Sequence, residues 1–127
     1  GAVGHSDADV LLHVICDALL GAANKRDIGF HFPDTSSDYK GIDSKKLLKQ
    51  VISIIAEDGW ITQNVDCTIC LQQPKLKPII PEMQQCIAEV MGTDVGRVSI
   101  KATTTEKLGF VGREEGVSAY AVALISR

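Results

Sequence analysis

The sequence predicts an α/β sandwich of the α+β kind, in which helices cover one face of a sheet. Three long stretches carry apolar residues at the spacing of helices, and three shorter ones alternate or are continuously apolar, as strands do. In chain order they form two helices, a strand, a helix and two further strands. The face of the sheet without helices then needs cover from another surface, such as a symmetry mate.

Length and composition fit one domain that spans residues 1–127. Hydrophobic residues make up 45% of the chain and charged residues 23%, which is typical of a folded soluble domain. The net charge of −3 argues against a nucleic-acid partner, because such proteins usually carry a basic excess. No apolar run approaches the ~20 residues of a membrane span, so no membrane partner is expected. We expect a cytoplasmic location in a bacterium, with a plastid-type organelle as the alternative.

The first helix is predicted in the stretch from 4 to 21, around which the rest of the chain is organised. Ser6 or Asp7 can cap its start, which places His5 just before the electropositive end of the helix. Beyond the cap this stretch is apolar on nearly all sides. That pattern is typical of a helix inside a domain, because no side of it gains from contact with water.

Asp9, His13 and Asp17 form a polar stripe on this apolar helix, since they are spaced four residues apart. A carboxylate is costly to bury unless it is paired or bound to a metal. The stripe therefore faces a cleft, a metal or a partner subunit. The alternative is that His13 is a structural histidine, hydrogen-bonded to its neighbours.

A long loop is predicted from 24 to 38, because this stretch is rich in Asp, Gly and Pro. Phe30 and Phe32 are its apolar anchors, and His31 is expected at the surface. Long irregular loops in a small domain are often functional, and the alternative is a packed connector.

The later elements follow from periodicity and from residues that start or end helices. We expect a helix from 45 to 58 that is capped by Asp43 or Ser44 and ended by Gly59, and a helix from Pro81 to Gly92. Strands are predicted at 65–72, 98–102 and 117–125, and the last of these is apolar enough to lie centrally in the sheet.

The Cys-x-x-C spacing of Cys67 and Cys70 is compatible with zinc or redox chemistry, but the alternation around it favours a strand. Residues three apart on a strand point to opposite faces and do not chelate one metal. We therefore interpret Cys16, Cys67, Cys70 and Cys86 as reduced thiols.

A second chemical stretch lies between the last two strands. Three consecutive threonines, Thr103 to Thr105, are followed by Glu106 at the end of a predicted strand. Hydroxyl and backbone N–H groups can hold phosphate oxygens, and a glutamate can hold magnesium beside them. The alternative is a polar connection between strands. Together with the stripe on the first helix, this stretch favours a metal-assisted phosphate site.

These motifs together resemble the 2-C-methyl-D-erythritol 2,4-cyclodiphosphate synthase family. The resemblance covers essentially the whole chain, in order and at the expected spacing, and is carried by the following residues: His5-Ser6-Asp7-x-Asp9, His13, Asp17, Asp27-Ile28-Gly29, Phe32-Pro33-Asp34-Thr35, Pro74-Lys75 and Lys101 to Phe110.

The resemblance implies a metal-dependent phosphorus–oxygen lyase of the non-mevalonate route to isoprenoids. Its substrate would be 4-diphosphocytidyl-2-C-methyl-D-erythritol 2-phosphate, a nucleotide diphosphate whose 2-phosphate attacks the β-phosphorus and releases CMP. It also implies a homotrimer with active sites between subunits. Catalysis would rest on positioning and on neutralising charge.

Site residues carry over from the family one by one. His13 would be a zinc ligand, Glu106 a contact to magnesium or manganese, and His5 and Thr104 transition-state stabilisers. Contacts to the erythritol and its phosphate would come from His5, Ser6, Asp27, Ile28, Gly29, Phe32, Pro33, Asp34, Thr35 and Ser36. The cytidine and diphosphate pocket would be formed by Leu71, Gln72, Gln73, Pro74, Lys75, Leu76, Lys77, Thr103, Thr104, Thr105 and Glu106, with Phe110 and Arg113 towards the threefold axis.

The family's zinc site also uses an Asp-x-His pair on a strand before the His-Ser-Asp motif. That strand region is missing from the sequence, because only four residues precede His5. Zinc sites of enzymes usually have three protein ligands. We therefore expect weak zinc binding by this chain, with cytidine nucleotides still bound. The alternative function is a non-catalytic trimeric binding module for nucleotide or prenyl diphosphates.

Overall fold

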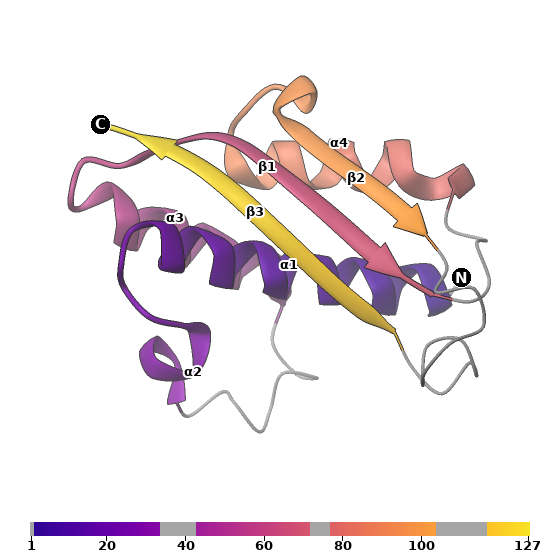
Figure 1. Ribbon diagram of the computed structural model, residues 1–127, viewed down its shortest axis with the longest axis horizontal. Helices are drawn as coiled ribbons and strands as arrows, with labels where there is room; N and C mark the ends of the chain where they lie inside the picture. Colours follow the sequence, from indigo (N-terminus) through magenta and orange to yellow (C-terminus); the bar gives the residue numbers. More distant parts are fainter. Residues whose placement is uncertain (1, 34–42, 72–76, 104–116) are drawn as a thin grey trace.

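The computed structural model describes residues 2–33, 43–71, 77–103 and 117–127, and Figure 1 shows their arrangement. In chain order the elements are α1 (Ala2–Ala22), α2 (Ile28–His31), α3 (Ser44–Ala56), β1 (Ile61–Cys70), η2 (Lys77–Ile79), α4 (Ile80–Met91), η3 (Val95–Arg97), β2 (Val98–Thr103) and β3 (Ser118–Ser126).

The strands form one sheet in the order β2-β1-β3, and the helices lie on one of its faces (Figure 1). Strand β1 pairs in parallel with β2, from Val65 opposite Val98 to Cys70 opposite Thr103. It pairs in antiparallel fashion with β3. The predicted sandwich with helices on one face is therefore confirmed.

The predicted central position of the last strand is wrong, because β3 lies at one edge of the described sheet and β1 lies at its centre. Strand β3 is apolar on both faces for two different reasons. Its alanines pack towards the core, whereas Tyr120, Val122 and Leu124 on the other face are exposed. An edge strand with two apolar faces has the sequence pattern of a central strand.

The hydrophobic core lies between the sheet and the helices. Leu11, Ile15 and Leu19 of α1 are fully buried, as are Val65 and Ile69 of β1. Helix α1 packs against β3 and α3, and the alanines of β3 allow its close approach. Because the burial of apolar surface drives folding, α1 and β1 supply much of the stability of this layer.

Helix α1 begins at Ala2, so the prediction that Ser6 or Asp7 caps its start is wrong. Ser6 and Asp7 lie inside the helix, and His5 lies in its first turns rather than before it. Residues 2–4 contain no proline, so they do not interrupt the helix. The helix therefore continues through Ser6 and Asp7, although residues of these types are also common at helix caps. The side of α1 that carries Val14 and Asp17 is only partly covered.

The predicted ends of the other helices follow local sequence rules. Asp43 caps α3, because its Oδ1 accepts a hydrogen bond of 3.0 Å from the Lys45 N–H. Gly59 has φ +84°, and the Gly59 and Trp60 N–H groups bond back to Ala56 and Ile55, as in a Schellman motif. Gly92 has φ 68° and ends α4 in the same way.

Strand β1 starts at Ile61, four residues before the predicted start at 65. Residues 61–64 pair with the C-terminal end of β3, and the register shifts between Thr62 and Asn64. This pairing joins segments distant in sequence, so the local pattern of residues does not reveal it. From Val65 onward the predicted alternation is confirmed, with buried Val65, Cys67 and Ile69.

Candidate functional site

Two residues of the polar stripe of α1, His13 and Asp17, contact the segments that follow this helix in the sequence. His13 is half-buried, and its Nε2 is joined to Ser44 Oγ by a hydrogen bond of 3.3 Å. Ser44, the first residue of α3, is 2% exposed. Burial lowers the pKa of His13, although the charges of Asp9 and Asp17 oppose this shift. The lowered pKa favours the neutral imidazole, which is the form that binds metals.

Asp17 contacts the start of the next element. Its Oδ1 accepts a hydrogen bond of 2.9 Å from the Ile28 N–H, at the beginning of α2. Ile28 is 4% exposed, so its side chain belongs to the core. His13 and Asp17 therefore hold the starts of α3 and α2 against α1, so these two polar residues have a structural role.

Residues 27–32 form a short capped helix within the predicted loop. Asp27 Oδ1 accepts from the Phe30 N–H at 3.2 Å, and Ile28 and Phe32 face the core. Phe30 is 53% exposed, so its expected role as an apolar anchor is wrong. One helical turn places Ile28 and Phe32 on the same side, and it directs Phe30 away from them, beneath the Arg26 guanidinium.

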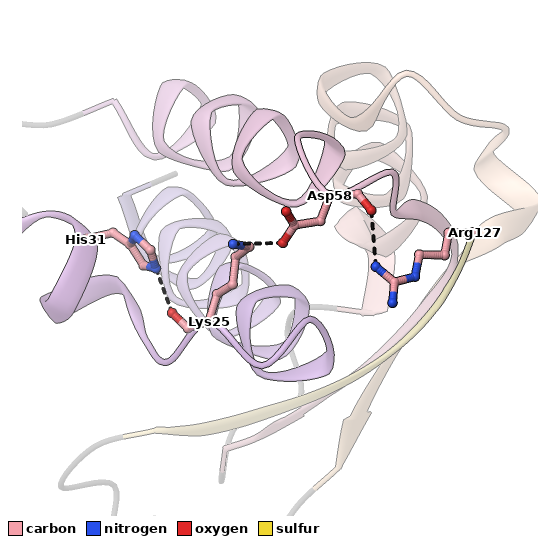
Figure 2. A network of polar contacts seen from close by, with 4 residues as sticks. All are labelled: Lys25, His31, Asp58 and Arg127. Atoms are coloured by element: carbon pink, nitrogen blue, oxygen red, sulfur yellow. Dashed lines mark hydrogen bonds and ion pairs between the residues drawn. The ribbon is translucent and has the colours of Figure 1, made fainter.

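His31 is half-buried, which corrects its predicted place at the surface. Its Nε2 donates to the Lys25 carbonyl oxygen at 2.6 Å (Figure 2). Lys25 Nζ in turn lies 2.9 Å from Asp58 Oδ2, and Arg127 donates to the Asp58 carbonyl oxygen at 3.3 Å. The Lys25 hydrogen bond lowers the pKa of Asp58. Sequence reasoning missed this network because its members are far apart in the chain.

The predicted nucleotide pocket has one described part, at the ends of β1 and β2. The Leu71 N–H donates to the Thr103 carbonyl oxygen at 2.9 Å, so the two stretches predicted to form the pocket start beside each other. Leu71 is 7% exposed, and its side chain belongs to the hydrophobic core cluster. Thr103 is exposed.

Two described parts of the predicted site, α2 and the ends of β1 and β2, lie towards opposite ends of the chain's fold. Figure 1 places the N-terminus at the same end as the arrowheads of β1 and β2, and α2 towards the other end. Residue 17, which holds α2, is roughly 22 Å along the helix axis from residue 2 at ~1.5 Å per residue. One chain therefore does not bring Asp27 to Thr103.

The remaining predicted contacts lie outside the described residues: Asp34, Thr35, Ser36, Gln72, Gln73, Pro74, Lys75, Leu76, Thr104, Thr105, Glu106, Phe110 and Arg113. The side chains of His5, Ser6 and Lys77 also lie outside what the structure describes. Of the predicted erythritol contacts, Asp27, Ile28, Gly29, Phe32 and Pro33 are placed together in and around α2.

Among the side chains that the structure describes, which leave out those of residues 2–7 and 77, there is no group of three or more metal-binding residues. His13 is half-buried and its lowered pKa favours the neutral form of a ligand, whereas a zinc site of an enzyme usually has three protein ligands. Likewise, no helix in the described ranges is long and apolar enough to cross a membrane.

The four cysteines are free, as predicted. Burial raises the pKa of both Cys16 and Cys67 to about 12, so these thiols stay protonated at neutral pH. Cys67 is buried and Cys70 is half-buried on the opposite face of β1, which confirms that this Cys-x-x-C spacing is a strand pattern.

A family model described as the YgbB family matches residues 1–126. The chain belongs to this family. Its relatives include the 2-C-methyl-D-erythritol 2,4-cyclodiphosphate synthases of Bacteroides fragilis and Porphyromonas gingivalis strain W83. The first is 66% identical over 127 residues, which cover 100% of this chain and 80% of the relative. The second is 62% identical over 125 residues, which cover 98% of this chain and 77% of the relative. The family resemblance found in the sequence is thus confirmed.

Solved structures of the YgbB family's synthases have the same fold. The bifunctional IspDF from Campylobacter jejuni matches with a TM-score of 0.86 and 43% identity, over 91% of this chain and 31% of that chain. The CDP complex of IspF from Plasmodium falciparum matches with a TM-score of 0.80 and 29% identity, over 91% of this chain and 69% of that chain.

Proposed function

We propose that this chain is a 2-C-methyl-D-erythritol 2,4-cyclodiphosphate synthase of isoprenoid biosynthesis. The observation that carries this proposal is its identity of 61–66% to synthases of this name over 98–100% of its length. The substrate is 4-diphosphocytidyl-2-C-methyl-D-erythritol 2-phosphate, and the products are 2-C-methyl-D-erythritol 2,4-cyclodiphosphate and CMP.

In this reaction an oxygen of the 2-phosphate attacks the β-phosphorus of the diphosphate. A new P–O bond closes the ring, the bond to the α-phosphate oxygen breaks, and CMP leaves with that oxygen. Such a transfer needs little covalent work from side chains, so the protein contributes mainly position and complementary charge. The segment around α2 holds the erythritol, and the chain beyond Leu71 and Thr103 holds the nucleotide.

We further propose that the reaction depends on divalent metals. His13 is one zinc ligand, and Glu106 is a contact to magnesium or manganese. When bound, these ions neutralise charge on the phosphates. Support for His13 comes from its half-buried position and from the burial that keeps its imidazole neutral.

The active site is proposed to form between subunits of a homotrimer. Two features of the single chain support this assembly. The α2 part of the candidate erythritol site and the ends of β1 and β2 lie towards opposite ends of the fold (Figure 1), and a second subunit would bring such parts together. The open face of β3 exposes Tyr120, Val122 and Leu124, which are suited to burial against another copy.

The test measures CMP release and zinc content of the purified protein. When the family's Asp-x-His pair precedes His5, as in a full-length protein, we expect the protein to release CMP, and we expect His13→Ala to lose both zinc and CMP release while its oligomeric state persists. His31→Ala is the matched control for zinc, because the described contact of this histidine is to a backbone carbonyl. Nucleotide binding without CMP release would instead favour the non-catalytic binding module, and full zinc content in His13→Ala would overturn the ligand assignment.

A further inference from the structure

We propose that Asp17 is a positioning residue, which fixes the substrate-binding segment 27–33 on helix α1. The inference rests on the proposed function, because that function makes Asp27, Ile28 and Gly29 contacts to the substrate. Asp17 itself is placed outside the substrate-binding set. It acts through the backbone of Ile28.

The contact between Asp17 and Ile28 joins two elements that are eleven residues apart in the sequence. A carboxylate that accepts a backbone N–H forms a charge-assisted hydrogen bond, which is stronger than a neutral one. Helix α2 has only four residues, and such a short helix is not stable by itself. Its position therefore depends on what holds its first residue.

The backbone before α2 follows a tightly constrained path. Asn24 and Arg26 adopt φ of 59° and 69°, values in the left-handed region that residues with side chains seldom occupy. Such conformations persist when surrounding contacts determine them. Here the Lys25 N–H bonds to the Leu20 carbonyl oxygen at 2.8 Å, and His31 bonds to the Lys25 carbonyl oxygen. The Asp17 contact then fixes the point at which the chain returns to α1.

Helix α1 holds both ends of the stretch between Ile28 and Ser44. Asp17 bonds Ile28, and His13, one turn earlier, bonds Ser44. The two attachment points are about 6 Å apart along the helix axis. The proposed zinc ligand His13 and the contact that holds the proposed substrate segment therefore lie on neighbouring turns of one rigid helix. Asp17 thereby sets the distance between His13 and this segment.

The orientation of Asp27 depends on the same contact. Asp27 Oδ1 caps α2 through the Phe30 N–H, and Asp27 precedes the residue that Asp17 holds. If Ile28 is released, this cap and the direction of the Asp27 carboxylate change with it. Loss of the Asp17 contact is thus expected to weaken substrate binding more than the chemical step.

The experiment compares Asp17→Ala, Asp17→Asn and the control Asp94→Ala with the wild-type protein. Asp94 is an exposed carboxylate before η3 and makes no side-chain cap bond there. For Asp17→Ala we expect the KM of the substrate to rise on the order of tenfold, with kcat changed by less than about threefold. The amide hydrogens of residues 28–32 should exchange on the order of tenfold faster. Asp17→Asn keeps an oxygen acceptor and should recover most of both losses, and Asp94→Ala should behave as wild type.

A purely structural role predicts a different pattern. It would reduce the affinity for CDP, whose proposed pocket lies at the ends of β1 and β2, as much as it reduces substrate affinity. Unchanged CDP affinity with raised KM supports the positioning role, whereas equal losses, or a KM in Asp17→Ala within about twofold of wild type, overturn it. A protein that carries the family's Asp-x-His pair before His5 and still releases no CMP would overturn the proposed function instead, and slow amide exchange in Asp17→Ala would then separately overturn the role of the contact.

Discussion

The two faces of the sheet differ in what covers them. On the face beneath the helices, Val65 and Ile69 of β1 are fully buried. On the other face, Tyr120, Val122 and Leu124 of the neighbouring β3 are 64%, 72% and 63% exposed. Apolar residues thus lie on both faces, but a single chain buries only one set.

The distribution of side-chain size in β3 shows which surface this strand is built to contact. Its small residues, Ala119, Ala121 and Ala123, face the helices of its own chain, and its large apolar residues face outward. Contiguous exposed apolar residues of this kind mark interaction sites. We infer that β3 packs against two layers. One is the helical layer of its own chain, and the other is a surface outside the chain that covers Tyr120, Val122 and Leu124.

The largest difference between the faces is expected in the stability of the subunit. Leu19→Ala removes a fully buried side chain and should lower the free energy of unfolding by about 2–5 kcal/mol. Leu124→Ala is the matched change on the open face, and in dissociated subunits it should change stability by less than about 0.5 kcal/mol. Urea unfolding at low protein concentration measures both. Equal losses would mean that the open face is already buried within one chain.

The next effect concerns assembly. Leu124→Lys places a charge within the exposed apolar patch of Tyr120, Val122 and Leu124 and should weaken association by roughly a hundredfold while the subunit stays folded. Sedimentation velocity over a range of concentrations reports this change. Val95→Lys is the control, because Val95 is a 44% exposed apolar residue that lies in η3, outside the sheet. Unchanged association of Leu124→Lys would show that the subunits meet elsewhere.

The smallest effect concerns the ion pair on the open face. Lys101 Nζ lies 2.7 Å from Asp66 Oδ2, and hydrogen bonds from Lys101 and then Ser99 lower the pKa of Asp66. Stability from this pair is therefore fully present above the unfolded pKa of Asp66 and is lost as pH falls through the lower folded value. For an exposed pair the contribution is within about 1 kcal/mol.

Unfolding of the wild-type protein and of Lys101→Met, compared at pH 3 and at pH 6, measures this pair. In dissociated subunits we expect the two proteins to differ slightly at pH 6 and to converge at acid pH. If assembly covers the open face, the difference at pH 6 should be larger in the assembled protein, because water then screens the pair less. An equal difference in both states would argue against burial of the pair in the assembly.

Local rules predicted much of the fold, because they depend on neighbouring residues. Asp43 is one of the two predicted caps of α3, and Gly59 and Gly92 are the predicted helix ends, since each works within one turn. The edge position of β3 and the early start of β1 were not predictable in this way. Both depend on pairing between segments that are about 60 residues apart in the chain.

The candidate site shows the same division. The stripe of Asp9, His13 and Asp17 was visible from its spacing, but its contacts to Ser44 and Ile28 appear only when α3 and α2 fold back on α1. His31 was expected at the surface because a polar residue in a loop usually is. Its hydrogen bond to Lys25 depends on the left-handed backbone of Asn24 and Arg26, and the local sequence does not predict that turn.

Strand β1 carries one thiol on each face of the sheet, Cys67 and Cys70, so chemical labelling can report on each face separately. Cys67 lies beneath the helices with a pKa of about 12, so an alkylating reagent reaches it as a thiolate only after the helical layer opens. Cys70, half-buried on the other face, responds to whatever covers that face. The labelling rates of these two cysteines would separate unfolding of a subunit from dissociation of the proposed homotrimer, without any change to the sequence.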